Sequence, residues 1–497
     1  MKKLNYATLK ETNYEGYILE NAPERVIQFG EGNFLRGFVD YFIDVANEKA
    51  NFDSKVVLVQ PIAEGLADKI NEQDGLYTLY LRGMENGQKV NNKRVISCVS
   101  RCLNPYGEFE KVLDCAKNPD LRYIACNTTE AGIVYDGSCK FDDMPQSSFP
   151  AKLTRFFYER FLHFGKESGK GFVVLSCELI DNNGKELKKC MLKHIKEWGL
   201  PVEFKNWMEA ENEICSTLVD RIVTGYPRNE IEAITKENGY EDNLVNTAET
   251  FGFWVIEGSE KLSQELPFAK ADLPVIVTAD HTPYKNRKVR ILNGAHTSIV
   301  LAAYLAGEDI VRNCMNNETI TRFMNDTIYK EIIPTLSLPK AELEEFAASV
   351  KDRFNNPFID HSLLAISLNS VSKWKARVLP SFKGYVEKFQ ELPKCITMSF
   401  AALIAFYNCD RLEEKEMIAK RQGPLGNEYA VNDDRFILEF FAEHKDDSVE
   451  ALAEAVCKNT AFWGEDLTSY SGFLERVISD LKLIREKGAK EAMQNCL

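Results

Sequence analysis

This chain has few histidines, no closely paired cysteines and no excess of positive charge. Its 13 cysteines form no C-x-x-C pair, and it has only six histidines. Zinc sites need ligands at short paired spacings, so this pattern predicts that no metal is bound. An odd number of scattered cysteines is instead typical of reduced, buried thiols in a reducing cytosol.

Long apolar runs are missing as well. The longest uncharged run, residues 395–409, is shorter than the ~20 residues that cross a bilayer, and it predicts a buried core helix. The N-terminus has two lysines but no apolar stretch behind them, which argues against a signal peptide and for the cytoplasm. The 61 basic and 75 acidic residues give a net charge of −14, so we expect neither nucleic acid nor a membrane as partner.

The first half of the chain alternates short apolar, β-branched runs with helical apolar spacing. This order predicts a doubly wound parallel sheet. The runs expected to be strands are 25–30, 55–61, 94–98, 122–126 and 172–177, with two later ones at 252–258 and 273–280.

The second part of the chain has a different pattern. Residues 263–287 contain three prolines and resemble a connection, and after Asn293 nearly every stretch has helical spacing. We therefore predict an α/β protein with two parts. A Rossmann-like domain at 1–280, a fold that typically binds a dinucleotide such as NAD, precedes a mainly α-helical domain at 281–497.

A glycine-rich turn follows the first expected strand and precedes a helix. Gly30 and Gly32 can bring the backbone close to a pyrophosphate at the helix N-terminus, although Leu35 stands where a third glycine is usual. An ordinary strand–helix turn remains the alternative. The second strand ends at Gln60, without the acidic residue that often binds a ribose, and no Lys or Arg lies within 56–68 to hold the extra phosphate of NADP. The balance favours NAD.

A second group of polar residues begins at Lys288, in a segment expected to be extended. Asn293 is placed to cap the helix that follows, and His296 lies three residues further on the same face. An amine can transfer a proton, an amide can donate to a developing alkoxide, and an imidazole can orient a hydroxyl. The alternative is a helix cap, a surface lysine and a core histidine.

Lys288, Asn293 and His296 resemble the K-x-x-x-x-N-x-x-H motif of the polyol-specific long-chain dehydrogenases, the mannitol dehydrogenase family. Further motifs similar to the family's follow in order along the whole chain, although the one at 219–222 continues differently. They are FGEGNF at 29–34, QDGLYT at 73–78, NTTEAGI at 127–133, Asn183-Gly184, VDRI at 219–222, RFNNPFIDH at 353–361 and FWGEDL at 462–467.

The resemblance implies metal-free, reversible hydride transfer between NAD(H) and a sugar carbonyl. It implies that Lys288 is the acid/base, that Asn293 and Asn183 form an oxyanion hole, and that His296 holds the substrate or the lysine. Asp220 is a candidate for binding a hydroxyl, with a structural pair to Arg221 as the alternative. The implied cofactor-binding residues are Phe29, Gly30, Gly32, Asn33, Phe34, Gln60, Asn127, Thr128, Thr129 and Glu130.

Within the family, the segments 25–40 and 369–381 are most similar to the branch that reduces tagaturonate. The mannitol and fructuronate branches carry histidines in the first helix, and this chain has none at 34–38. A keto-uronate or aldonate partner needs a cation for its carboxylate, and Lys373 and Arg377 are candidates. A fructuronate or mannitol-type enzyme and a non-catalytic NAD(H)-binding regulator remain alternatives.

Overall fold

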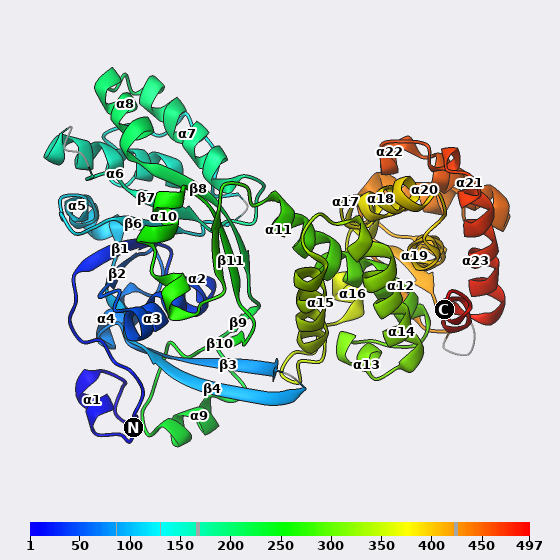
Figure 1. Cartoon of the computed structure of the whole chain (residues 1–497), viewed down its shortest axis with the longest axis horizontal. Coiled ribbons are helices and arrows are strands. Elements are labelled where there is room, and N and C mark those ends of the chain that lie inside the picture. The colour runs from blue at the N-terminus through cyan, green and yellow to red at the C-terminus, as the bar shows by residue number, and fades with distance from the viewer. Residues whose placement is uncertain (86, 130, 166–168, 422–425) are drawn as a thin grey trace. The chain divides into compact units, whose positions relative to one another are not determined.

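The computed structural model (Figure 1) describes every residue of the chain except 86, 130, 166–168 and 422–425. The chain divides into two compact units. Unit 1 comprises Met1–Arg82 and Val90–His281, and unit 2 comprises Gly83–Lys89 and Thr282–Leu497. The short segment at 83–89 thus belongs with unit 2, although it lies far from the rest of that unit in the sequence.

Unit 1 is built on an eight-stranded sheet whose central strands are parallel (Figure 1). Only the β8–β11 pair is antiparallel in the ladders described. The strand order confirms the predicted Rossmann-like sheet. In spatial order the strands are β12 (Val275–Thr278), β11 (Phe253–Glu257), β8 (Glu213–Asp220), β7 (Val173–Ser176), β6 (Tyr123–Cys126), β1 (Glu24–Phe29), β2 (Lys55–Val59) and β5 (Val99–Leu103).

Helices cover both faces of this sheet. Adjacent strand residues such as Val26 and Ile27 belong to different buried clusters, because successive side chains point to opposite faces. One face carries α5 (Pro105–Cys115), α6 (Phe149–Phe164), α7 (Asn183–Glu197) and α8 (Val202–Glu211), and the other carries α2 (Asn33–Gly37), α3 (Val39–Ala50), α4 (Ala67–Glu72) and the 3₁₀ turn η1 (Phe268–Ala271). Burial on both faces explains the uninterrupted apolar runs of the central strands.

A second sheet corrects one predicted strand. Residues 94–96 end β4 (Gln88–Ile96), which pairs in the order β4-β3-β10-β9 with β3 (Tyr77–Glu85), β10 (Asn246–Glu249) and β9 (Val223–Gly225). The edge strand of the main sheet is β5 instead. Most of β4 is polar and exposed, as suits an edge strand, so its apolar end gives a misleading signal. Smaller helices of unit 1 are α1 (Tyr6–Lys10), α9 (Ile231–Asn238) and α10 (Glu260–Glu265).

Unit 2 is mainly helical, as predicted. Its two central helices are buried around their whole circumference. Helix α19 (Lys394–Phe406) is buried from Cys395 to Phe406, which confirms the predicted core helix. Helix α12 (Gly294–Leu305) is almost as deeply buried. The other elements are α11 (Thr282–Arg287), the π-helical turn η2 (Lys288–Asn293), α13 (Val311–Met315), α14 (Glu318–Asp326), the π-helical turn η3 (Thr327–Ile332), α15 (Lys340–Phe354), α16 (Leu363–Ile366), α17 (Ser370–Arg377), α18 (Leu379–Phe389), α20 (Arg435–Glu443), α21 (Val449–Lys458), α22 (Thr460–Trp463), α23 (Phe473–Lys487) and α24 (Ala489–Asn495).

A small antiparallel sheet in unit 2 was not expected. It consists of β13 (Cys409–Leu412), β14 (Met417–Lys420) and β15 (Glu428–Val431). Each strand has only four residues, which is too short to show a clear alternation of apolar and polar side chains. Within the predicted connection at 263–287, β12 confirms the strand predicted at 273–280, whereas α10, η1 and α11 were not expected.

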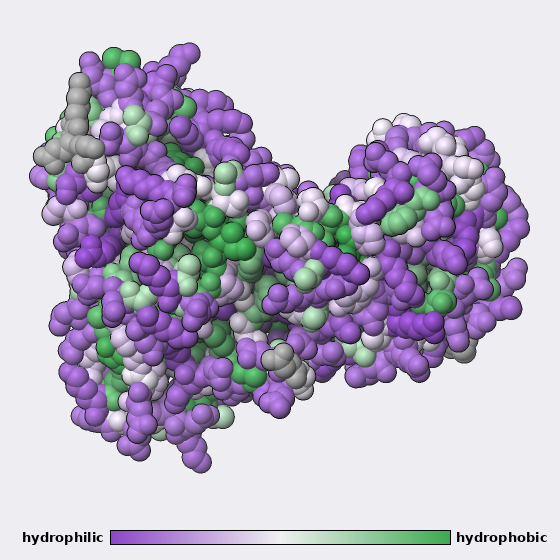
Figure 2. Space-filling model, viewed as in Figure 1, coloured by the Kyte–Doolittle hydropathy of each residue, from purple (hydrophilic) through white to green (hydrophobic). Residues whose placement is uncertain are grey.

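Among the described residues, no helix is both long enough and apolar enough to cross a membrane. All 13 cysteines are unpaired, and all except Cys409 are buried. This agrees with the predicted reduced, buried thiols. The face shown in Figure 2 is mostly hydrophilic.

Candidate active site

The glycine turn after β1 is tight at Gly30 and open at Gly32. Gly30 follows β1, its N–H donates to the Val59 carbonyl at 2.9 Å, and its φ of +127° favours glycine. A Cβ on Gly30 would lie 2.9 Å from Leu35 Cδ1. Leu35 therefore fills the space beside the strand where a third glycine is usual. A Cβ on Gly32 would meet nothing within 4 Å, so the backbone at the start of α2 is open to a ligand.

The start of α2 gives different environments to two other predicted cofactor-binding residues. Asn33 is exposed, and its side-chain oxygen accepts a hydrogen bond from Arg36 at 2.8 Å. The Phe34 ring is half-buried and stacks on Phe38 with ring centres 5.2 Å apart.

Gln60, which directly follows β2, holds the next loop in place through its side-chain amide. Its Nε2 donates to the Ile62 and Ala63 carbonyls at 2.8 and 3.0 Å, and its Oε1 accepts from the Ala67 N–H at 3.1 Å. The side chain is 2% exposed. The Gln60 amide is therefore fully used in holding the loop after β2. A ligand at this point would meet the loop backbone rather than a free Gln60 side chain.

The loop after β6 is held by a buried acid that the sequence analysis did not single out. Glu178 Oε1 accepts from both the N–H and the hydroxyl of Thr128, at 3.1 and 3.2 Å. Burial raises the pKa of Glu178. Asn127 donates to the Cys177 carbonyl at 3.1 Å, and Thr129 has a positive φ of 73°. The predicted Glu130 lies outside the described residues.

A pocket of about 850 Å³ opens at the carboxyl ends of β1, β2 and β6. Its walls include Phe29, Gln60 and the chain at 127–129. In open parallel sheets, ligands bind in the crevice outside the carboxyl ends of the strands. Five of the predicted cofactor-binding residues therefore line one pocket.

The side-chain amide of Asn183 is hydrogen-bonded to the backbone around it. Its Nδ2 donates to the carbonyls of Ser176, Glu178 and Thr217, and its Oδ1 accepts from the backbone N–H of Gly184 and Thr217. The residue is fully buried. With every donor and acceptor in use, Asn183 links the end of β7 to Thr217 within β8. Its predicted place in the oxyanion hole stays a prediction.

Asp220 is buried at the carboxyl end of β8. The neighbouring Arg221 donates to three backbone carbonyls, those of Phe251, Gly37 and Thr250. The guanidinium group of Arg221 is therefore held by hydrogen bonds to the surrounding backbone. The proposed role of Asp220 toward a substrate hydroxyl stays a prediction.

The residues from Lys288 to His296 lie on one continuous helix, which corrects the prediction of an extended segment and a capping asparagine. Asn293 has helical φ/ψ and makes no capping hydrogen bond. The turn η2 is π-helical, and the Gly294 N–H donates to the Val289 carbonyl five residues back. π-helical turns inside α-helices often occur at functional sites.

The π-helical turn explains the spacing of the motif. In a regular α-helix, residues five apart are separated by about 140° around the axis. In a π-helical turn, with hydrogen bonds from i to i+5, residues five apart such as Lys288 and Asn293 lie close to one face. His296 follows Asn293 by three residues in the regular α-helix α12, which again places the two on one face. Lys288, Asn293 and His296 therefore face the same side of this helix.

His296 is surrounded by aromatic rings and positive charge. Its ring stacks on Phe354 with centres 4.1 Å apart and meets His361 edge-on at 5.7 Å. Its Nε2 is buried without a hydrogen-bond partner among the described residues. Burial lowers the pKa of His296 well below its ordinary value, and the charges of His361, Arg353, Arg377 and Lys373 lower it further. The imidazole is therefore neutral at physiological pH.

Helix α17 presents two of its three cations to this region. Lys373 and Arg377 are four residues apart and share a face, and both act on His296. Lys373 Nζ donates to the Ile366 carbonyl at 2.8 Å. A Cβ on Gly294 would lie 3.2 Å from the Arg377 carbonyl, which shows how closely α17 approaches the motif helix. Lys375 instead extends toward Gly464.

Two residues beside His296, Arg353 and His361, are not among the predicted site residues. Burial lowers the pKa of His361, so Arg353 is the one that adds positive charge. Both lie in the segment 353–361, which the sequence analysis noted only as a motif. An arginine and a histidine in one short segment that matches a family motif are the signal that could have identified them.

Family models match both parts of the chain. The mannitol dehydrogenase Rossmann domain matches residues 24–270, and the mannitol dehydrogenase C-terminal domain matches residues 280–485. The chain belongs to the mannitol dehydrogenase family. This confirms the predicted oxidoreductase that acts on CH–OH groups with NAD as its cofactor.

Relatives in the mannitol dehydrogenase family match over nearly full length. An altronate oxidoreductase of Enterobacter sp. (strain 638) is 44% identical over 494 residues, covering 98% of this chain and 99% of the relative. The altronate oxidoreductase of Shigella flexneri is 44% identical over 493 residues, with the same shares.

Solved structures of other dehydrogenases share the fold at lower identity. A substrate-free D-sorbitol dehydrogenase is 21% identical with a TM-score of 0.83, covering 99% of this chain and 100% of the other. A Pseudomonas fluorescens mannitol 2-dehydrogenase in complex with NAD and D-mannitol is 21% identical with a TM-score of 0.68, covering 99% of both chains.

Proposed function

We propose that the chain interconverts D-tagaturonate and D-altronate with NAD(H). The positive cluster around His296 carries this proposal, because a uronate or aldonate bears a carboxylate that a neutral polyol lacks. The altronate oxidoreductases at 44% identity support the same substrate. The cytoplasmic location and metal independence remain predictions from the sequence.

Unit 1 has the features to bind the cofactor. The open backbone at Gly32 fits a pyrophosphate, and the pocket beyond β2 and β6 has room for an adenosine. NAD(H), when bound, supplies or accepts the hydride. The residues of the chain supply binding, orientation and the proton.

Unit 2 supplies the proton and the hydrogen bonds. Lys288 Nζ gives a proton to the carbonyl oxygen during reduction and takes it back during oxidation. The Asn293 side-chain amide donates to the same oxygen as negative charge develops on it. Neutral His296, held by the Phe354 ring, can accept a hydrogen bond from a substrate hydroxyl or from the lysine through its buried Nε2.

Arg377 and Lys373 bind the substrate carboxylate in this proposal. Burial lowers the pKa of Arg377, and burial together with the Arg377 charge lowers that of Lys373. A carboxylate placed between two partly buried cations would relieve their repulsion. A neutral sugar would leave them unpaired, at a cost of ~2–5 kcal/mol.

A substrate panel with three matched variants tests the proposal. Reduction of D-tagaturonate, D-fructuronate and D-fructose is followed through NADH absorbance for wild type and for Arg377→Met, Lys373→Met and Lys375→Met. We expect wild type to prefer tagaturonate. Arg377→Met and Lys373→Met should each lower kcat/KM for tagaturonate by more than about tenfold and change that for fructose much less. Lys375→Met, on the opposite face of α17, is the control and should change neither.

Four results would contradict this proposal. A wild-type preference for fructose would favour the mannitol-type alternative, and a preference for fructuronate would favour the other uronate branch. Equal losses on tagaturonate and fructose in the Arg377 and Lys373 variants would show that these cations do not bind the carboxylate. A regulator would bind NADH without turning over any member of the panel.

A further inference from the structure

A buried lysine without an acidic partner lines the pocket of unit 1. Lys152 lies in the first turn of α6 and is 6% exposed. Its Nζ lies 3.4 Å from the Tyr106 hydroxyl and 5.2 Å from the centre of the Tyr106 ring. Among the described residues, it makes no ion pair with a carboxylate. A buried ammonium group is costly when unpaired, so this position suits an anionic ligand.

The position of Lys152 is tied to the end of β2. The Tyr106 hydroxyl, which lies beside the Lys152 ammonium group, donates to the Pro61 carbonyl at 2.9 Å. Pro61 is the second residue after β2. In dinucleotide-binding folds the end of the second strand contacts the adenosine ribose, where an acidic residue binds the free 2′-hydroxyl and a basic residue accommodates a 2′-phosphate.

Among the residues that the structure describes, no acidic residue offsets the lysine at this end of the pocket. Gln60 stands where dinucleotide-binding folds often have an acidic residue, and its amide is hydrogen-bonded to the loop that follows β2. Asp136 is the one carboxylate among the described lining residues, and it accepts hydrogen bonds from the side chains of Ser138 and Ser147. Glu64 is exposed and does not line the pocket.

We propose that Lys152 binds the 2′-phosphate of NADP(H), so that the chain accepts NADP(H) as well as NAD(H). This inference deepens the proposed function, because it rests on the adenosine half of the cofactor occupying this pocket. The pyrophosphate belongs at the glycine turn, and the only other anionic group at the adenosine end is a 2′-phosphate. Burial lowers the pKa of Lys152, and a phosphate beside it would stabilise the charged form.

The test measures binding rather than turnover. Dissociation constants of NADH and NADPH are obtained from nicotinamide fluorescence. Thermal shifts with 5′-AMP and with adenosine 2′,5′-bisphosphate isolate the contribution of the 2′-phosphate. For wild type we expect the two dissociation constants to agree within about tenfold and the bisphosphate to stabilise at least as well as 5′-AMP. Lys152→Met should weaken NADPH binding at least about tenfold, as for the loss of one charged hydrogen bond, and NADH binding less than about threefold.

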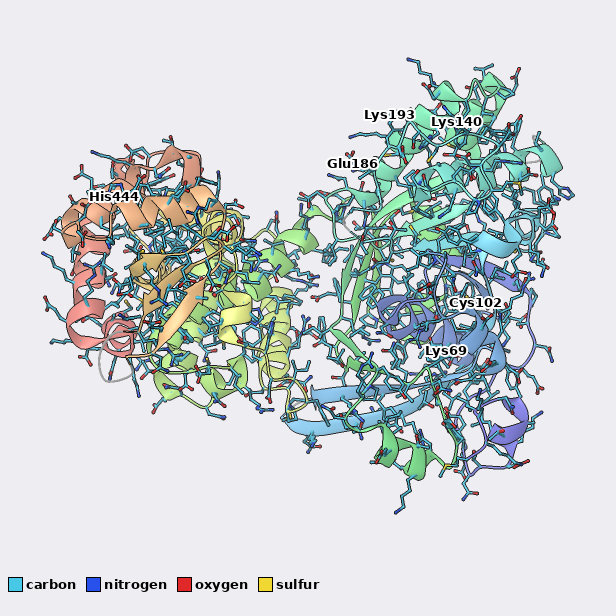
Figure 3. The ribbon with its side chains drawn as sticks, turned by 180° about the vertical axis from the view of Figure 1, so that it is seen from behind. Lys69, Cys102, Lys140, Glu186, Lys193 and His444 are labelled. Atoms are coloured by element: carbon cyan, nitrogen blue, oxygen red, sulfur yellow. The ribbon has the colours of Figure 1, made fainter. Side chains whose placement is uncertain are left out.

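Two further variants serve as controls. Lys152→Arg keeps the charge and should retain NADPH binding. Lys140→Met removes an exposed lysine of the same unit (Figure 3) and should change neither cofactor. The inference is overturned if wild type binds NADH but binds NADPH more than about a hundredfold more weakly. It is also overturned if Lys152→Met weakens both cofactors equally. Failure of wild type to bind NADH at all would reject the cofactor assignment itself.

Discussion

The chemistry of unit 2 depends on the environments of single side chains. Neutral His296 lies within a group of cations, and Asn293 has a helical backbone and makes no capping hydrogen bond. Lys288 lies on the same helix as both. These three environments differ enough that substitution at each position should have a distinguishable effect.

Removing the proposed acid/base should stop turnover without affecting cofactor binding. Lys288→Ala loses the group that protonates the carbonyl oxygen, so kcat should fall by about 10²–10⁴-fold while NADH binds unchanged. Steady-state kinetics and NADH fluorescence measure the two effects. Lys330→Ala is the control, since this exposed lysine of η3 forms an ion pair with Asp326 at the end of α14. Near-normal turnover in Lys288→Ala at neutral pH would refute the assignment.

The two asparagines predicted to form the oxyanion hole should respond differently to substitution. Asn183→Leu leaves several buried backbone groups without partners and should lower the free energy of unfolding by about 3 kcal/mol or more. Asn293→Ala should leave stability nearly unchanged and lower kcat by about 10²–10³-fold. Denaturant melts and kinetics on the folded fraction separate these outcomes. An unchanged melt with a large kcat loss in Asn183→Leu would support its predicted catalytic role.

His296 should make unit 2 sensitive to acid. Its pKa in the folded protein is below that of the unfolded chain, so the unfolded state binds more protons once the pH falls below about 6.5. The free energy of unfolding should therefore drop by up to about 1.4 kcal/mol per pH unit from there down to the folded pKa. His296→Phe should reduce this slope in melts between pH 7.5 and 5. An unchanged slope would show that other groups cause it.

At the scale of elements, the contact between the motif helix and α17 places the catalytic and cationic residues together. The π-helical turn aligns Lys288 with Asn293, and Gly294 allows α17 to approach. Glycine within a helix is normally unfavourable, so a glycine at this site has a packing role.

Replacing that glycine tests the contact. Gly294→Ala should ordinarily stabilise a helix by about 1 kcal/mol, but its Cβ would lie 3.2 Å from the Arg377 carbonyl. We expect no gain in stability and a several-fold rise in KM for the uronate as α17 moves. Denaturant melts and kinetics measure both. A more stable protein with unchanged KM would show that α17 adjusts without consequence.

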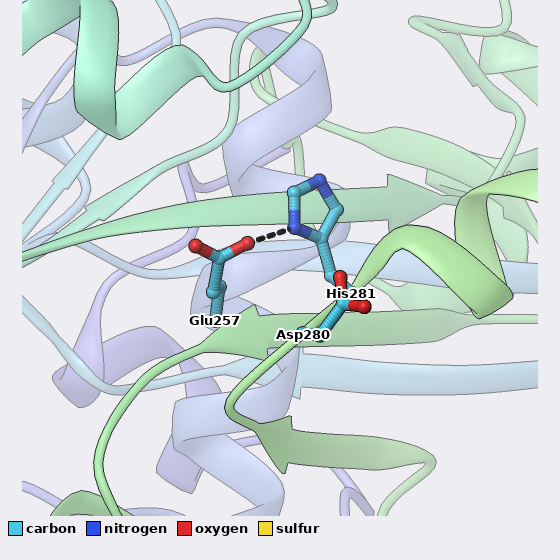
Figure 4. A group of neighbouring side chains, drawn as sticks. All are labelled: Glu257, Asp280 and His281. Atoms are coloured by element: carbon cyan, nitrogen blue, oxygen red, sulfur yellow. Dashed lines mark hydrogen bonds and ion pairs between the residues drawn. The ribbon is translucent and has the colours of Figure 1, made fainter.

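At the scale of the whole molecule, we expect activity that needs no metal ion. Glu257, Asp280 and His281 (Figure 4) form the one group among the described residues whose side chains could together hold a metal ion. Both oxygens of Glu257 are engaged, one by His281 Nδ1 and the other by Lys185 Nζ at 2.6 Å. Although burial alone would raise the pKa of Glu257, these hydrogen bonds lower it. The carboxylate therefore already has charged or polar partners.

Exhaustive chelation tests this expectation. Activity should persist after dialysis against a strong chelator, and elemental analysis of the active enzyme should find less than one metal per chain. Loss of activity that zinc restores would contradict the prediction and direct attention to Glu257 and its neighbours.

The sequence by itself determined the division into an α/β part and a helical part, the Rossmann-like sheet and the family. These follow from local periodicity and from motifs within short windows, which do not need distant partners. The tertiary structure alone decided which polar groups are free. The Asn183 amide is hydrogen-bonded to the backbone of β7 and β8, and the Gln60 amide to its own loop. Arg353 and His361 lie with Arg377 around His296. Likewise Lys152, on α6, reaches the end of β2, where nearby sequence offers no cation. Hydrogen-bond partners and buried charges come from segments that are distant along the chain, so spacing alone cannot assign them.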